Sequence, residues 1–157
     1  MSNETAAQKE SKPKTGTTEV YAVNEDEVDT ETLARDIARL SWDLKALNTT
    51  VLDLRGLVSY TDFAIVCTAT SERQVKAIAK HVQNSLSEVG YDPMGVEGVE
   101  SGTWALLDYG DAILHIFKGD VRDEYDLERM WPDAPELELE DRPEELYGHF
   151  ELERLQG

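Results

Sequence analysis

The feature that most constrains the fold is an apolar run at residues 63–68, Phe-Ala-Ile-Val-Cys-Thr. A strand with one face in water alternates apolar and polar residues, whereas this run is apolar at almost every position and rich in Phe, Ile and Val. It therefore predicts a strand that is buried on both faces. Because such a strand needs helices packed on its sheet, the run favours the α/β class.

Two amphipathic helices are predicted around this strand. Apolar residues recur at spacings of three and four from residue 33 to residue 47, which predicts a helix over about 30–47 with Asp29 or Thr30 as N-cap. A second helix is predicted to begin at Ser71, which forms a capping-box pattern with Gln74. Gly90 provides the stop signal for this second helix.

A hairpin and a last helix are predicted in the second half of the chain. Residues 104–108 and 112–117 read as two strands around a tight turn, in which Gly110 supplies the positive φ. Asp120 is predicted to cap a final helix that runs through Trp131. The remaining elements are a short strand at 50–54 and a small strand or loop at 94–98. The order αββα, small strand, hairpin, α predicts a small mixed β-sheet flanked by helices.

The hairpin strands are apolar on both faces. We expect one face to carry Trp104, Leu106, Ala112, Leu114 and Ile116, and the other to carry Ala105, Leu107, Ile113 and Phe117. Three predicted helices are few for the two faces of a sheet of four or five strands, so part of this apolar surface is free to remain open. An exposed aromatic residue beside acidic turns would make a protein-binding patch.

Charge divides the chain into three parts. The formal net charge is -18. Residues 1–29 are polar and acidic and are predicted to form a disordered arm. Residues 30–131 form the predicted α/β domain. Residues 132–157 hold nine acidic and two basic residues. They are interpreted as a solvated acidic tail, with a short helix over about 143–155 as the open alternative.

The composition narrows the partner class. A charge this negative argues against direct binding to nucleic-acid phosphates and suits a basic protein partner. The sequence has no run of 18 apolar residues, so no membrane span is expected. The single cysteine, Cys67, excludes an intramolecular disulfide framework and favours the cytoplasm. It lies in the apolar run, where a small hydrophobic role is favoured over a reactive thiol.

Catalytic patterns are scarce. The sequence contains no P-loop and no GxGxxG pattern. A two-metal phosphoryl transferase usually carries an Asp-x-Asp pair on one strand, but Arg55 stands where the second carboxylate after Asp53 would be. Turn chemistry is the favoured account of Asp108 and Asp111. For His115, inside an apolar strand, a satisfied buried imidazole is favoured over a catalytic base. No catalytic residue, metal or cofactor is therefore expected.

Several of these segments share a further pattern, in one colinear order. They are VLDLRGLVSYTDF at 51–63, CTATSERQV at 67–75, GVEG at 95–98, WALLDYGDAILHIF at 104–117 and YDLERMW at 125–131. Together they resemble the ribosomal silencing factor family, also called RsfS or Iojap, over residues 30–131. Ala69 departs from the usual glycine of the family, and both acidic ends lie outside the resemblance.

The resemblance implies a nucleotidyltransferase-like fold without its catalytic carboxylates, and a function that is not enzymatic. It implies binding to a protein of the large ribosomal subunit, the one numbered fourteen, on the face that meets the small subunit. The bound factor would then obstruct subunit joining and repress translation when nutrients are limiting.

The resemblance also implies partner-binding residues in the 104–117 block. Trp104 is expected as a central aromatic contact, and Asp108, Tyr109 and Asp111 as contacts at the rim. Leu106 and His115 complete the expected set. A homodimer through the same surface is a further possibility. The alternative functions are a metal-dependent nucleotidyltransferase that retains activity, using Asp62 and Asp108, and an adaptor that binds a basic protein through the acidic tail.

Overall fold

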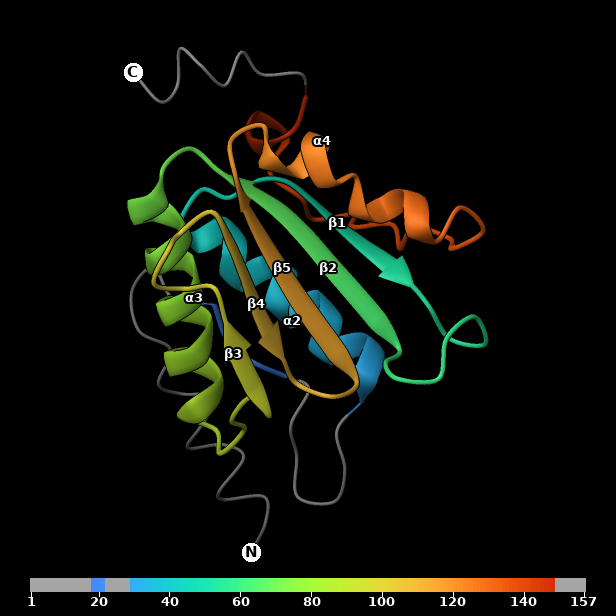
Figure 1. The fold of residues 1–157 in the computed structure, drawn as a ribbon. Coiled ribbons are helices and arrows are strands. Elements are labelled where there is room, and N and C mark those ends of the chain that lie inside the picture. Colours follow the sequence, from blue (N-terminus) through green and yellow to red (C-terminus); the bar gives the residue numbers. More distant parts are fainter. Residues whose placement is uncertain (1–17, 22–28, 149–157) are drawn as a thin grey trace, which may run out of the picture.

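The structure is a computed structural model, and it describes residues 18–21 and 29–148. Over these residues the chain forms a five-stranded sheet with helices on both sides (Figure 1). The elements in chain order are α2 (Thr30–Asp43), β1 (Leu47–Asp53), β2 (Phe63–Ala69), α3 (Glu72–Ser87), β3 (Gly95–Glu97), β4 (Trp104–Asp108), β5 (Ala112–Lys118), α4 (Val121–Tyr125), and the 3₁₀ turns η1 (Leu127–Met130) and η2 (Glu144–Leu146).

The sheet is mixed, as predicted. Its strand order is β1-β2-β5-β4-β3. The β2–β5 pair is parallel, and the other three pairs are antiparallel. The parallel pair arises because the chain crosses from β2 through α3 before it returns along the hairpin. The likeness to nucleotidyltransferases stays a prediction.

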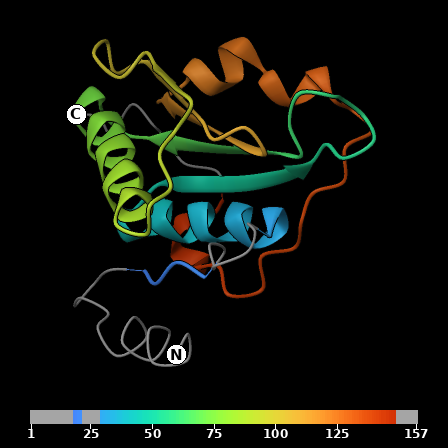
Figure 2. The same ribbon diagram turned by 90° about the horizontal axis from the view of Figure 1, so that it is seen from below.

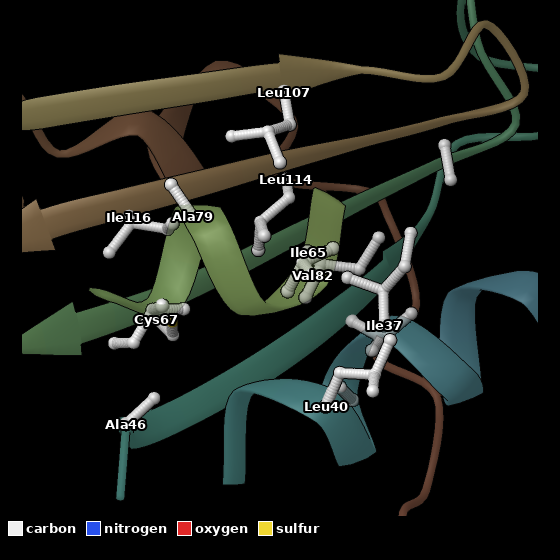
Figure 3. Packing of buried hydrophobic residues seen from close by; sticks show 14 of the residues in the cluster. Ile37, Leu40, Ala46, Ile65, Cys67, Ala79, Val82, Leu107, Leu114 and Ile116 are labelled. Atoms are coloured by element: carbon white, nitrogen blue, oxygen red, sulfur yellow. The ribbon is translucent and has the colours of Figure 1, made fainter. Parts of the chain in front are cut away.

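Strand β2 is buried at all seven positions, which confirms the prediction from its apolar run. Helices α2 and α3 pack on one face of the sheet, and α4 with η1 lies on the other (Figure 2). The main core lies between the sheet and the helix pair, and it includes Ile65 and Cys67 of β2, Ile37 of α2 and Val82 of α3 (Figure 3). Among the described residues, no helix combines the length and apolar character needed to cross a membrane.

Helix α2 begins where predicted but ends at Asp43 rather than Leu47. Lys45 adopts a positive φ of 67°, and the Ala46 and Lys45 N–H groups donate to the carbonyls of Ser41 and Trp42. This is a Schellman-type stop made without glycine. The apolar spacing continues past it because Leu47 is buried in β1 instead of in the helix.

Helix α3 follows its predicted signals with one difference. The Ser71 hydroxyl accepts from the Gln74 N–H at 3.1 Å. The Gln74 side chain accepts from the N–H of Thr70, rather than of Ser71, and donates to the carbonyl of Leu44 at 2.8 Å. Gln74 therefore also joins the start of α3 to the end of α2. Gly90, with a φ of 83°, follows the helix.

The last predicted helix is wrong as a single element. The chain forms the five-residue α4, reverses at Asp126 with a φ of 49°, and continues as η1. The Asp120 side chain makes no capping hydrogen bond within the described residues. The break lets Leu127 turn into the sheet, where it is buried against Val66 and Phe117.

Residues 132–148, which we name the C-terminal strap, do not form the expected solvated tail. The carbonyl of Pro135 and the N–H of Leu137 bond to the backbone of β1, so the strap covers that edge of the sheet. It then passes to the α2 side (Figure 2), where the Trp42 indole donates to the Tyr147 hydroxyl at 3.1 Å. Arg39 of α2 pairs with Asp141 at 2.8 Å. The alternative helix at 143–155 lies partly outside the described residues, and only the short turn η2 forms in its first part.

The expectation of a disordered arm also fails at residues 18–21. The Thr18 hydroxyl donates to Asp43 at 2.8 Å, and the N–H of Tyr21 donates to Asp36 at 2.8 Å. This short segment therefore lies along α2. The rest of the predicted arm, residues 1–17 and 22–28, lies outside the described residues, as do residues 149–157.

Candidate functional site

The register of the hairpin corrects the expected division of its faces. Trp104 pairs with Phe117, Leu106 with His115, and Leu107 with Leu114. Paired residues point to the same side of a sheet, so even-numbered residues of β4 share a face with odd-numbered residues of β5. The sequence-based assignment instead placed the even-numbered residues of both strands on one face. The turn sets the register, and the apolar pattern does not indicate how the turn pairs the two strands.

The described helices cover one face of the hairpin and leave part of the other open. Ala105, Leu107, Leu114 and Ile116 belong to the core beneath α2 and α3. The opposite side carries residues that we name the hairpin face, namely Trp104, Leu106, Asp108, Ile113 and His115. Apart from His115, these residues are half-buried. Among the described elements, α4 and η1 lie over this side of the sheet at β2 and β5, and no helix lies in front of β3 and β4 (Figure 1).

Trp104 is the centre of an aromatic cluster on this face. Its ring lies 4.9 Å from that of Phe117 and 4.7 Å from that of Tyr125, measured between centroids. Phe117 is fully buried below it, whereas Tyr125 is 58% exposed at the end of α4. Trp104 is therefore a held aromatic surface, with one side against the protein.

His115 serves as a support for Trp104. The indole N–H of Trp104 donates to Nδ1 of His115 at 3.2 Å, which places the proton of the neutral ring on Nε2. Burial lowers the pKa of His115 to about 4, so the imidazole is neutral at pH 7. The side chain is only 6% exposed, so its expected part in partner binding can act only through Trp104 in this conformation.

The three expected rim residues have different positions. Asp111 is exposed at the hairpin turn. Asp108 is half-buried and accepts the N–H of Gly110 at 2.8 Å, in agreement with the turn chemistry inferred for it. Tyr109 does not lie at the rim. It is 3% exposed on the covered side, and its ring stacks on Tyr91 at 5.5 Å.

Tyr125 is a surface residue that the sequence pattern does not indicate. It lies in the segment that is predicted to continue as one helix through Trp131, but the break at Asp126 leaves it exposed beside Trp104. Tyr125 belongs to the block YDLERMW and Trp104 to the block WALLDYGDAILHIF, so neither segment by itself indicates that the two rings meet. Ile113 joins the hairpin face for the same reason, since only the register places it there.

The carboxylates that the structure describes do not gather into a metal centre. Among residues 18–21 and 29–148, no group of three or more His, Cys, Asp and Glu side chains could hold a metal ion. The Arg55 guanidinium binds both carboxylate oxygens of Asp53, at 2.9 and 2.7 Å, and this lowers the pKa of Asp53. The metal-dependent transferase stays an untested alternative.

Comparison with known proteins agrees with the resemblance of the sequence blocks. The family model described as "Ribosomal silencing factor during starvation" (RsfS) matches residues 27–153. A ribosomal silencing factor of Halalkalibacterium halodurans is 40% identical over 98 residues, which are 62% of this chain and 84% of the relative. A chloroplastic Iojap protein of Arabidopsis thaliana is 33% identical over 115 residues, which are 73% of this chain and 48% of that relative.

Solved structures show the same fold. A crystal structure from Bacillus halodurans has a TM-score of 0.62 and 34% identity, and the match covers 71% of this chain and all of that one. A crystal structure from Chromobacterium violaceum has a TM-score of 0.58 and 38% identity, covering 69% of this chain and 96% of that one. With a family model that spans the whole α/β unit, this chain belongs to the ribosomal silencing factor (RsfS/Iojap) family.

Proposed function

We propose that this protein silences ribosomes by binding the large subunit and sterically blocking the joining of the small subunit. Its direct partner would be the large-subunit ribosomal protein numbered fourteen, on the intersubunit face, and the effect would be to repress translation under nutrient limitation. The observation that carries the proposal is the open hairpin face, with Trp104 at its centre, in a chain of this family.

The proposed contact uses the residues that are accessible on the hairpin face. Trp104, Leu106 and Ile113 supply an apolar centre, since each is half-buried and borders the open side. Rigid aromatic residues of this kind are the usual anchors of protein interfaces. Asp108 and Asp111 would serve at the rim, and His115 would act by supporting Trp104.

The charge of the protein suits this partner. Glu97 of β3 pairs in the sheet with Leu106, so a further exposed carboxylate stands beside the hairpin face. Acidic groups around an apolar centre attract a basic ribosomal protein and weaken adhesion to the phosphates of ribosomal RNA. The protein would therefore find a protein target within a surface that is mostly nucleic acid.

The proposed mechanism needs no bond to be made or broken. A bound factor occupies space that the small subunit requires, so the effect depends on occupancy alone. We place this action in the cytoplasm, and the single cysteine, a buried free thiol, agrees with a reducing compartment. That a second copy of the chain binds the hairpin face in competition with the large subunit stays a prediction.

A subunit-joining assay tests the proposal. Purified large subunits are incubated with saturating protein, mixed with small subunits, and separated on a sucrose gradient. We expect the joined particle to decrease in proportion to occupancy, which is measured from the protein that sediments with the large subunit. Unchanged joining at full occupancy would contradict the steric mechanism. Failure of the protein to sediment would contradict the choice of partner.

A further inference from the structure

We propose that Tyr125 is a partner contact continuous with Trp104, and that Arg122 is the positioning residue that holds α4 so that this contact exists before binding. The inference rests on the proposed function, since it extends the surface through which the large subunit would be bound. It starts from the two aromatic rings, 4.7 Å apart, which come from β4 and α4.

Helix α4 has little of its own to hold it in place. None of its five residues is buried; Val121 packs on the apolar cluster around Phe117, and the Tyr125 ring lies at the edge of that cluster, 6.3 Å from the ring of Phe117 between centroids. A single helical turn is not stable by itself in water. The orientation of Tyr125, which is 58% exposed, therefore depends on contacts that reach from α4 to the sheet.

Arg122 provides those contacts with all of its side-chain donors. Nη1 donates to the carbonyl of Asn48 at 2.6 Å and to the Thr68 hydroxyl at 3.3 Å. Nη2 donates to the Thr50 hydroxyl at 3.2 Å and to Glu128 at 2.7 Å, and Nε lies 3.5 Å from Glu128. These partners belong to β1, to β2 and to η1, so one side chain joins α4 to two strands and to the segment that follows it.

The place where Arg122 binds the sheet has an irregular backbone. Asn48 has a φ of 51° and lies where the β1–β2 register shifts, and its carbonyl accepts from Arg122. The Arg122 side chain is only 12% exposed, which protects these charge-assisted bonds from water. A lysine could not satisfy this set, because it lacks the planar fork of donors.

The arrangement preorganises the partner surface. With α4 fixed, Tyr125 stays against Trp104, and binding does not have to order a loose turn. Without Arg122, α4 would move away from the sheet and Tyr125 with it. If Arg122 only stabilised the fold, replacing it would not weaken the binding of a variant that remains folded. Weaker binding by a folded variant therefore indicates a positioning role.

The test compares four variants for binding to purified large subunits by co-sedimentation. Tyr125→Ala and Arg122→Met are each expected to weaken binding by about tenfold. Arg122→Met placed on the Tyr125→Ala background should add less than about twofold, because both changes remove the same contact. The matched control is Arg129→Met, which removes the same charge from an exposed arginine whose ion-pair partner is Asp126, and it should bind as the unmodified protein does.

An independent readout uses the free protein. The three tryptophans give three indole N–H signals in NMR spectra of ¹⁵N-labelled protein, and Trp104→Phe identifies one of them. Arg122→Met should shift the Trp104 signal and leave that of Trp42, which is bonded to Tyr147 in the C-terminal strap. If Arg122→Met does not fold, Glu128→Gln and Arg122→Lys make the same comparison with milder changes.

The outcomes separate this inference from the proposed function. Weaker binding by Trp104→Ala together with normal binding by Tyr125→Ala would overturn the inference alone. A full further loss for Arg122→Met on the Tyr125→Ala background, or an unmoved Trp104 signal, would overturn the positioning role of Arg122. Normal binding by every one of these variants would instead contradict the proposed surface.

Discussion

The indole N–H of Trp104 donates to the Nδ1 of His115, 3.2 Å away on the neighbouring strand. The polar atom of the most prominent side chain on the hairpin face is thus satisfied inside the protein. What Trp104 offers a partner is ring surface in a fixed orientation. The bond also means that the ionisation of His115 affects the shape of this face.

The first prediction concerns pH. His115 has a pKa of about 4 in the folded protein, below its ordinary value of 6.5, because burial disfavours the charged ring. The unfolded chain therefore binds the proton more readily, and the free energy of unfolding should fall as the pH drops from about 6.5 to about 4. The loss is on the order of 3 kcal/mol. Urea denaturation across this range measures it.

The control for this prediction is His115→Asn, whose amide oxygen can accept from Trp104 without titrating. We expect the slope of stability against pH to decrease in this variant over the same interval. An equal slope in both proteins would show that other groups cause the dependence. The acidic groups paired in the fold, such as Asp43 with its lowered pKa, act mainly at lower pH.

The second prediction concerns the hairpin face. Trp104→Ala should weaken binding to the large subunit by at least ~2 kcal/mol, or roughly thirtyfold, because it removes the aromatic centre of the proposed interface. Co-sedimentation with purified large subunits measures the change. Leu57→Ala alters an exposed apolar residue of the β1–β2 loop and should leave binding as it is. Equal retention of both variants would remove Trp104 from the interface.

The third prediction concerns the C-terminal strap. The Tyr147 hydroxyl accepts from the Trp42 indole and donates to the carbonyl of Thr49 at 2.6 Å. Tyr147→Phe should lower the free energy of unfolding by about 1–3 kcal/mol, because both partners lose their bond. Tyr60→Phe, at an exposed tyrosine, is the control and should change stability little. Similar urea midpoints for both variants would contradict docking of the strap.

Truncation tests the alternative that the protein is an adaptor that binds its partner through the acidic tail. Removal of residues 149–157 retains every described contact of the strap, including the bond that the Gly148 N–H donates to the Asn48 side chain, so we expect the fold to persist. If this truncated protein still binds the large subunit, binding does not depend on those last residues. Removal of residues 132–157 would also uncover the β1 edge, so it cannot serve as a clean test of the tail.

The fourth prediction concerns Cys67. The thiol is fully buried in β2, and burial raises its pKa to about 12. Because the thiolate is the reactive form, we expect no labelling by a thiol reagent at pH 8 in the native protein and complete labelling in denaturant. Mass spectrometry of the quenched reaction gives the extent of labelling. Rapid native labelling would contradict the burial of this strand.

Local signals were sufficient for the elements whose ends are marked by side-chain chemistry. Ser71 and Gly90 bracket α3 as expected, and the apolar run 63–68 is a doubly buried strand. The ends of α2 and α4 were missed because Lys45 and Asp126 adopt positive φ values without being glycine. Such backbone conformations are stabilised by contacts that the local sequence does not display.

The sequence by itself determined the α/β class, the element order, the family and the block that holds Trp104. Only the tertiary structure decided which side of the hairpin is open, that Tyr109 is covered and Tyr125 is not, and that the acidic strap closes the β1 edge. The reason is that helix and strand periodicity is a property of neighbouring residues. Register, the path of a strap and the pairing of Trp104 with Tyr125 depend on residues that meet only after the chain has folded.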